Sequence, residues 1–335
     1  MKIAFLSTES EEMEKIKEGL SEHQLIFVSG DADENSSQIK DVDILSVFIK
    51  TKITKEFIDR FTDLKLIATR SMGFDHIDVK AAEEKGIVVV NVPTYGSRTV
   101  AEYTFSLILG LSRKSYAAYD RLRENGMTDV KDYEGFDLQG KTIGVIGTGN
   151  IGKNVIKIAR GFSMKVIAFD VFEDQDSATE IGFEYNTLDN VLKNSDIVTI
   201  HVPYIKATHH LISEEKLKLM KKNAFLINTA RGEIVDTKAL VNALEEKRIA
   251  GAGLDVLEGE RILNDELDLV TEEINDIDEF QILLADHKLI DMKNVIVTPH
   301  IAFNTKEAKE EILQTTIDNI KSFVGGEVKN NVSKK

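Results

Sequence analysis

A glycine-rich turn in the middle of the chain, VIGTGNIG at residues 145–152, most constrains what this sequence can fold into. An apolar stretch typical of a β-strand leads into the turn, and a stretch with apolar residues on one helical face follows it. In such a unit the first glycine permits a tight turn, the second lets the backbone approach a pyrophosphate, and the third lets helix and strand pack closely. The start of the helix offers unpaired N–H groups to the phosphates. The predicted dinucleotide site comprises Gly147, Gly149, Asn150, Ile151 and Gly152.

The residue that ends the next apolar stretch indicates which dinucleotide would bind. KVIAF at residues 165–169 is followed by Asp170. A carboxylate at this strand end can accept hydrogen bonds from both ribose hydroxyls and would repel a 2′-phosphate. No arginine follows at residues 171–172 to hold such a phosphate, so we predict NAD rather than NADP. The alternative is a glycine-bearing turn that binds no ligand.

Strand-like runs alternate with helical stretches on both sides of the glycine turn. This alternation predicts parallel sheets covered by helices on both faces. At about 150 residues per domain, 335 residues fit two domains. The expected fold is therefore α/β, with two Rossmann-like doubly wound parallel-sheet domains in series. Residues 306–323 read as a helix, and the tail at 329–335 as frayed chain.

The composition excludes several classes of function. The chain has no cysteine, which excludes disulfides, thiolate nucleophiles, iron–sulfur clusters and zinc thiolates. Its seven histidines form no tight metal-binding pattern, so we expect no metal. A net charge of −15 without a run of lysine and arginine argues against nucleic acid as a partner. The apolar runs are too short for a bilayer span or a signal peptide, and we expect a cytoplasmic protein without a membrane partner.

Three later segments place polar residues directly after apolar strands: NTARG, LDVLEGE and TPH. The carboxyl ends of parallel strands meet at one sheet edge, where ligands bind. The guanidinium of Arg231 suits a carboxylate ligand, and His300 can move a proton near neutral pH. A carboxylate beside a histidine stabilises its protonated form and fixes its tautomer. The acidic residues available for this are Asp255, Glu258 and Glu260.

Taken in order, GTGNIG with Asp170, HVP, NTARG, LDVLEGE and TPH resemble the NAD-dependent D-2-hydroxyacid dehydrogenase family over nearly the whole chain. RSMGFDHID, NVPTYGSRTVAE and TPHIAFNT are most similar to its D-lactate dehydrogenase branch. The resemblance implies an oxidoreductase, most simply one that reduces pyruvate with NADH to D-lactate, and a homodimer. It also implies a discontinuous substrate-binding domain (1–100 plus 304–335), an NAD-binding domain (101–303) and an active site in the cleft between them.

The resemblance further implies roles for individual residues. Arg231 would bind the substrate carboxylate, and His300 would be the general acid in reduction and the base in the reverse direction. Glu260 would pair with His300, with Glu258 as the competing choice. The remaining implied contacts are Met72, Gly73 and Tyr95 to the substrate, and Thr229, Val202, Pro203 and Asp255 to the cofactor.

Two features depart from the family pattern. Glu260 and His300 are separated by 39 residues, more than in most members, and the acidic segment 261–293 could be a lid or a partner surface. The loop after Tyr95 lacks the serine-proline usual in the D-lactate branch, which bears on side-chain selectivity. Alternative substrates are 3-phosphoglycerate, for which Lys50 and Lys52 are the only candidate phosphate ligands, or a branched or aromatic acid. An alternative of another class is an NAD-sensing binding protein similar to corepressors of this fold.

Overall fold

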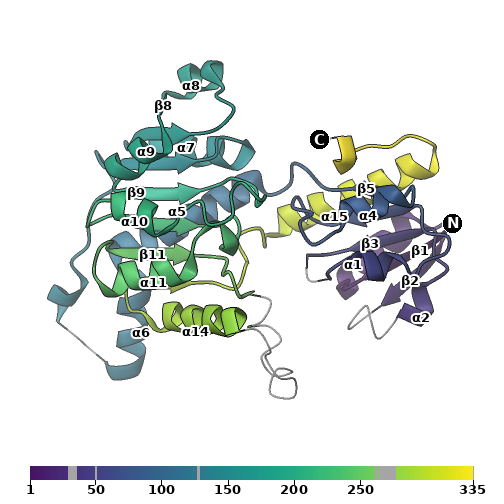
Figure 1. The fold of residues 1–335 in the computed structure, drawn as a ribbon, viewed down its shortest axis with the longest axis horizontal. Coiled ribbons are helices and arrows are strands. Elements are labelled where there is room, and N and C mark those ends of the chain that lie inside the picture. The colour runs from purple at the N-terminus through teal and green to yellow at the C-terminus, as the bar shows by residue number, and fades with distance from the viewer. Residues whose placement is uncertain (29–35, 50, 127–128, 261–262, 264–276, 335) are drawn as a thin grey trace. The chain divides into compact units, whose positions relative to one another are not determined.

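The computed structural model describes residues 1–335 except 29–35, 50, 127–128, 261–262, 264–276 and 335. The chain forms two compact units. Unit 1 comprises Met1–Gly96 and Thr305–Lys335, and unit 2 comprises Ser97–Asn304. Both are parallel-sheet α/β units, as the alternation of strands and helices predicts (Figure 1).

Unit 1 contains a five-stranded sheet in the order β2-β1-β3-β4-β5, in which every pairing is parallel. This is the flavodoxin-like order, whose direction reverses between β1 and β3. Successive residues of β1 point to opposite faces, so Ile3 and Phe5 join one core cluster while Ala4 and Leu6 join the other. The strands are β1 (Lys2–Leu6), β2 (Gln24–Val28), β3 (Ile44–Val47), β4 (Leu66–Thr69) and β5 (Val88–Val90).

Helices cover both faces of this sheet. α1 (Ser10–Gly19) and α15 (Lys306–Val324) contribute to one core cluster, and α3 (Lys55–Ile58) and α4 (Val79–Glu84) contribute to the other. A short helix, α2 (Ser36–Ile39), precedes β3.

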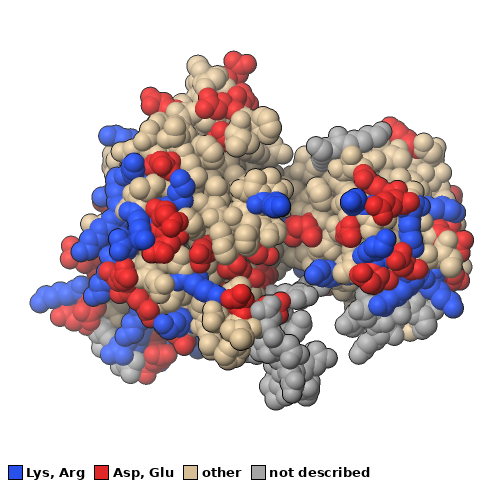
Figure 2. Space-filling model, viewed as in Figure 1, with Lys and Arg blue, Asp and Glu red and all other residues tan. Residues whose placement is uncertain are grey.

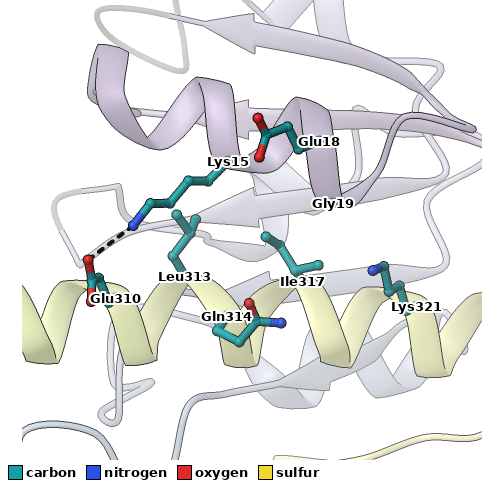
Figure 3. A pocket seen from close by; sticks show the side chains of 8 residues that line it. All are labelled: Lys15, Glu18, Gly19, Glu310, Leu313, Gln314, Ile317 and Lys321. Carbon is teal, nitrogen blue, oxygen red and sulfur yellow. Dashed lines mark hydrogen bonds and ion pairs between the residues drawn. The ribbon is translucent and has the colours of Figure 1, made fainter.

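The helix near the C-terminus returns to unit 1 and packs on α1. A β-carbon at Gly19 would lie only 3.0 Å from the Ile317 side chain, so the two helices approach closely there. A shallow hollow lies between them, and the Lys15 ammonium reaches across it to Glu310 at 3.2 Å (Figure 3). None of the residues predicted for a functional site lines this hollow.

Unit 2 contains a seven-stranded parallel sheet in the order β12-β11-β10-β9-β6-β7-β8. The direction of the order reverses at β6, which has β7 on one side and β9 on the other. Ligands of open parallel sheets bind where the order reverses, outside the carboxyl ends of the strands. The strands are β6 (Thr142–Ile146), β7 (Lys165–Phe169), β8 (Glu184–Tyr185), β9 (Ile197–Ile200), β10 (Phe225–Asn228), β11 (Gly251–Leu254) and β12 (Val295–Val297).

Two core clusters hold the helices against this sheet. Cluster residues come from α5 (Ser97–Arg113), α7 (Asn150–Gly161) and α8 (Gln175–Ile181) on one face. The other cluster takes residues from α9 (Leu188–Asn194), α10 (Glu214–Leu219), α11 (Thr237–Glu245) and α14 (Ile277–Asp291). A further helix, α6 (Ser115–Asn125), follows α5.

Acidic and basic side chains are interspersed over the visible face of each unit, without a broad basic patch on that face (Figure 2). Among the residues that the structure describes, no helix combines the length and apolar character needed to cross a bilayer.

Candidate active site

The glycine turn follows β6, and each of its glycines has a distinct steric reason. Gly147 has φ +95°, and a β-carbon there would lie 2.6 Å from the carbonyl oxygen of His201. A β-carbon at Gly152 would overlap the carbonyl oxygen of Gly147, so this glycine permits the close packing of α7 on β6. In contrast, a β-carbon at Gly149 would have no heavy atom within 4 Å. The space beside Gly149 is therefore open, as the approach of a pyrophosphate requires.

Asp170 lies directly after β7 and is tied to the same turn. Its Oδ2 accepts hydrogen bonds from the backbone N and the hydroxyl of Thr148, at 2.6 and 3.0 Å, and its Oδ1 accepts from Phe172 N at 3.0 Å. Oδ2 thus accepts two hydrogen bonds, and Oδ1 accepts one and retains lone-pair capacity for a further donor. The N-cap residue of α7 is Gly149, so no side chain caps the first N–H groups of that helix. These groups and the Asp170 carboxylate fit the phosphates and the ribose of NAD.

The segments that carry Arg231, Glu260 and His300 follow three neighbouring strands. β10 pairs with β11, and β11 pairs with β12, both in parallel. Their carboxyl ends therefore lie at one edge of the unit 2 sheet, the same edge at which the glycine turn leaves β6. The parallel order of the strands therefore brings Arg231, Glu260 and His300, which are predicted to act together, to this edge.

The histidine of this set is paired with a carboxylate. Nδ1 of His300 lies 2.9 Å from Oε1 of Glu260, and the two side chains are 20% and 32% exposed. Nε2 of His300 makes no hydrogen bond with any other described residue. The competing Glu258 instead lies 2.7 Å from Nε2 of His210. The glutamate that contacts His300 is therefore Glu260, which the family resemblance favours, and Glu258, the competing choice, contacts another histidine.

Asp255 holds the loop that carries His300. Its Oδ1 accepts hydrogen bonds from the hydroxyl of Thr298 at 2.6 Å and from Ile301 N at 3.0 Å, and its Oδ2 accepts from Ala302 N at 2.8 Å. The backbone N of His300 donates to the Asp255 carbonyl at 2.8 Å. Burial of the carboxyl raises the pKa of Asp255, although these donors oppose the shift. The loop is fixed on both sides of His300, whose own φ is +53°.

Asn228 holds the turn that carries Arg231, and this turn packs against the turn at residues 257–260. The side-chain amide of Asn228 donates to the Arg231 carbonyl at 2.8 Å, and its Oδ1 accepts from Ala230 N at 3.0 Å. The Arg231 guanidinium donates to the Ala230 carbonyl at 2.8 Å. A β-carbon at Gly232 would overlap the backbone of Leu257, so the two turns touch backbone to backbone. The positions of Arg231 and of the turn before Glu260 are therefore coupled.

The other residues predicted to contact the cofactor lie at the same sheet edge. Thr229 follows β10 and is buried, with its hydroxyl 3.1 Å from that of Thr104 on α5. Val202 and Pro203 follow β9, and a β-carbon at Gly147 would lie 2.9 Å from the Val202 side chain. Their roles toward a cofactor remain predictions.

The residues predicted to contact the substrate from unit 1 follow β4 and β5. The Ser71 hydroxyl donates to the Gly73 carbonyl at 2.6 Å, and the side-chain amide of Asn91 donates to the Met72 carbonyl at 2.7 Å. Within the described part of the chain, the backbone N–H groups of Met72 and Gly73 donate to no acceptor. Tyr95 is buried. Their roles toward a substrate also remain predictions.

The candidate phosphate ligands gain no support. Lys50 lies outside the described residues, and Lys52 is exposed. The acidic segment 261–293 is described only at Leu263 and from 277 onward, where α14 forms most of it. No group of side chains suited to hold a metal ion occurs in the described ranges.

Sequence reasoning missed a buried carboxyl, Asp286 on α14. Its Oδ2 accepts a hydrogen bond from Gly259 N at 2.8 Å, directly between Glu258 and Glu260. A signal was available, because Asp286 lies midway between Leu283 and Leu289 at helical spacing. An acidic residue on the apolar face of a helix is unusual and needs a partner.

Comparison with known proteins agrees with this geometry. Residues 105–302 match the family model described as "D-isomer specific 2-hydroxyacid dehydrogenase, NAD binding domain". The chain belongs to the D-isomer-specific 2-hydroxyacid dehydrogenase family, and it is an NAD-dependent oxidoreductase.

Individual relatives differ in the substrate that their names specify. The chain is 37% identical to the glyoxylate reductase of Thermococcus litoralis, over 89% of this chain and 85% of that protein. It is 38% identical to the D-3-phosphoglycerate dehydrogenase of Methanocaldococcus jannaschii, over 90% of this chain but only 53% of that one. Among solved structures, it is similar to D-lactate dehydrogenase from Aquifex aeolicus complexed with NAD and lactic acid. The TM-score is 0.88, with 39% identity and 98% of each chain covered.

Proposed function

We propose that this enzyme is a D-lactate dehydrogenase, which reduces pyruvate with NADH to D-lactate and NAD. The observation that carries the chemistry is the 2.9 Å contact between Nδ1 of His300 and Glu260, on a sheet edge shared with Arg231. The substrate assignment draws support from the likeness to the Aquifex aeolicus enzyme along 98% of both chains.

In this proposal each residue of the edge has one task. Arg231 binds the carboxylate of the 2-oxo acid and polarises its carbonyl group. Bound NADH supplies the hydride that the carbonyl carbon receives. Nε2 of His300 delivers the proton that the carbonyl oxygen takes up, which completes the hydroxy acid. Glu260 accepts from Nδ1, and so fixes the tautomer and stabilises the protonated imidazole.

The substrate residues of unit 1 complete the proposal. The N–H groups of Met72 and Gly73 would donate to the substrate carboxylate, while their carbonyls are already held by Asn91 and Ser71. Tyr95 would border the position of the substrate side chain.

A second candidate is reduction of glyoxylate, because the glyoxylate reductase of Thermococcus litoralis is 37% identical to this chain. Glyoxylate has the same carboxylate and carbonyl groups as pyruvate and lacks only the methyl group. Arg231 and His300 would act on both acids in the same way. A single missing methyl group changes transition-state binding by only about 1–3 kcal/mol in an apolar pocket, so the ratio of activities must be measured.

We also propose a cytoplasmic homodimer. Its support is a group of exposed apolar side chains on consecutive helices, α5 and α6: Leu109, Tyr116, Tyr119 and Leu122. Such surfaces mark interaction sites when they are contiguous. Light scattering on the protein as it elutes from a size-exclusion column measures the mass of the particle in solution. A monomer at micromolar concentration would contradict the dimer.

The experiment that tests the function is oxidation of NADH by the purified enzyme with a panel of 2-oxo acids: pyruvate, glyoxylate, 2-oxobutyrate, 2-oxoisocaproate, phenylpyruvate and 3-phosphohydroxypyruvate. The highest kcat/KM with pyruvate, yielding the D-isomer, is the expected result. A higher kcat/KM with glyoxylate or another acid would overturn the D-lactate assignment and leave the family unchanged. His300→Ala should reduce turnover on the order of a hundredfold or more.

A further inference from the structure

Asp286 is a fully buried carboxyl that the proposed mechanism does not use. It is 0% exposed and lies on the face of α14 that also buries Leu283, Ala285 and Leu289. Removing a carboxyl from water is costly unless it is hydrogen-bonded or neutral. The position of Asp286 therefore needs an explanation in what it contacts.

Asp286 contacts the short turn at residues 257–260, which ends at Glu260. Its Oδ2 accepts from Gly259 N at 2.8 Å, and a β-carbon at Gly259 would lie 2.6 Å from the same oxygen. On either side of Gly259, Glu258 contacts His210 and Glu260 contacts His300. The bond from Asp286 therefore fixes the backbone between two glutamates that face different histidines.

The surroundings favour the neutral form of this carboxyl. Burial, aided by the charges of Glu258 and Glu260, raises the pKa of Asp286 to about 7, against the opposing effects of the Gly259 N–H and His287. Its Oδ1 is buried and has no hydrogen-bond partner among the described residues. A neutral carboxyl still accepts from Gly259 N through Oδ2 and adds no third negative charge beside the two glutamates.

No charged group on the helix packed against α14 supplies a counter-charge to Asp286. On α11, Lys238 contacts Asp278 and Gln281, and Glu245 contacts Lys288. The four charged residues among these form two ion pairs at the surface, Lys238 with Asp278 and Lys288 with Glu245. The Gly259 N–H is thus the only hydrogen-bond donor to Asp286 among the described residues.

We propose that Asp286 is a positioning residue of this enzyme: through the Gly259 N–H it holds the turn 257–260 so that the Glu260 carboxylate meets Nδ1 of His300. This inference rests on the proposed roles of Glu260 and His300. It gives a task to α14, which lies within the acidic segment that separates these two residues. In this proposal α14 supports the turn from which Glu260 reaches His300.

The test compares Asp286→Ala, Asp286→Asn and Gly259→Ala, with Asp291→Asn as a matched control on the exposed end of α14. Asp286→Ala removes the acceptor, and Gly259→Ala places a β-carbon 2.6 Å from Asp286 Oδ2 and so displaces the same turn. Asp286→Asn keeps an oxygen that can accept from Gly259 N. For each variant, kcat and KM for 2-oxo acid reduction are measured against pH, together with NADH binding by fluorescence and the melting temperature.

The expected result has three parts. Asp286→Ala and Gly259→Ala lower kcat on the order of tenfold or more, with NADH binding retained, because Glu260 no longer faces the imidazole. The pH above which reduction is lost moves down in both, since the protonated imidazole has lost its stabilising carboxylate. Asp286→Asn restores both properties to near those of Asp291→Asn and the wild type.

Other outcomes would overturn the inference. If Asp286→Ala and Gly259→Ala change only the melting temperature and leave kcat and the pH profile as in the wild type, Asp286 has a merely structural role. If Asp286→Ala does not fold, the kcat and the pH profile of Gly259→Ala alone decide whether the turn positions Glu260. Glu260→Gln serves as the reference: if it leaves kcat and the pH profile unchanged, the proposed role of Glu260 fails. If it alters both while the other variants do not, only the positioning inference fails.

Discussion

Glu258 and Glu260 are separated by one glycine, and they contact different histidines. Glu258 lies 2.7 Å from His210, whereas Glu260 lies 2.9 Å from His300. Side chains two residues apart would share one face of an extended strand, so the turn at residues 258–259 is what directs these two apart. Two acidic residues that are equivalent in sequence therefore have different surroundings.

This difference predicts unequal effects of the two isosteric substitutions. Glu260→Gln should lower kcat for 2-oxo acid reduction about 10-fold to 100-fold, because a neutral amide stabilises the protonated His300 less. Glu258→Gln should leave kcat within about threefold, since its amide oxygen can still accept from His210. Steady-state kinetics of the two variants, side by side, measures this. Equal losses would show that the glutamates act as one unit.

The turn that carries Arg231 contacts the turn at residues 257–260, and this contact predicts that Gly232→Ala lowers activity. In Gly232→Ala the new β-carbon would overlap the backbone of Leu257, so the two turns must separate. Both Arg231 and the turn before Glu260 would then shift, and kcat/KM should fall on the order of a hundredfold for a displacement of about 1 Å. NADH binding by fluorescence should change much less. An alanine variant with wild-type kcat/KM would contradict the coupling of the two turns.

Two glycines of the dinucleotide turn predict opposite phenotypes. Gly149→Ala adds a β-carbon where no atom lies within 4 Å, so its melting temperature should match the wild type while its affinity for NADH falls. Gly147→Ala places a β-carbon 2.6 Å from the His201 carbonyl at φ +95°, and should cost about 2 kcal/mol of stability or more. Thermal unfolding and NADH titration of both variants test this. Undiminished NADH affinity in Gly149→Ala would argue against a pyrophosphate beside this residue.

Burial of Asp286 predicts a pH-dependent difference in stability. Its pKa is raised from 3.8 to about 7 in the folded protein. Between these two values the unfolded chain loses the proton while the folded protein keeps it, so rising pH favours unfolding. Relative to Asp286→Asn, the wild type should therefore lose stability from about pH 4 to about pH 7, by up to about 4 kcal/mol, and then level off. Denaturant unfolding of both proteins across this range gives the difference. A difference independent of pH would mean that Asp286 is ionised throughout.

The parts of the site that follow directly from local pattern were predictable from sequence. The strand, the three glycines and Asp170 lie within one stretch of chain, so their order alone specifies their chemistry. Arg231 and His300 are distant in sequence, but each directly follows an apolar strand. Parallel strands end at one edge, and this rule brings the two residues to the same sheet edge without any knowledge of packing.

Tertiary packing decided what local pattern left open. The tail was expected to fray, yet Asn331 bridges to Val90 and Val332 is buried, because the edge strand β5 offers unpaired backbone groups. The choice between Glu258 and Glu260 depended on the backbone path around Gly259, which a helix 27 residues further along the chain holds in place. The sequence by itself determined the two parallel sheets, the dinucleotide turn and the residue types at the sheet edge, because these arise from periodicity and strand direction. Only the tertiary structure decided which carboxylate meets His300 and which N–H group the buried Asp286 accepts from, because such contacts depend on where segments distant in sequence pack.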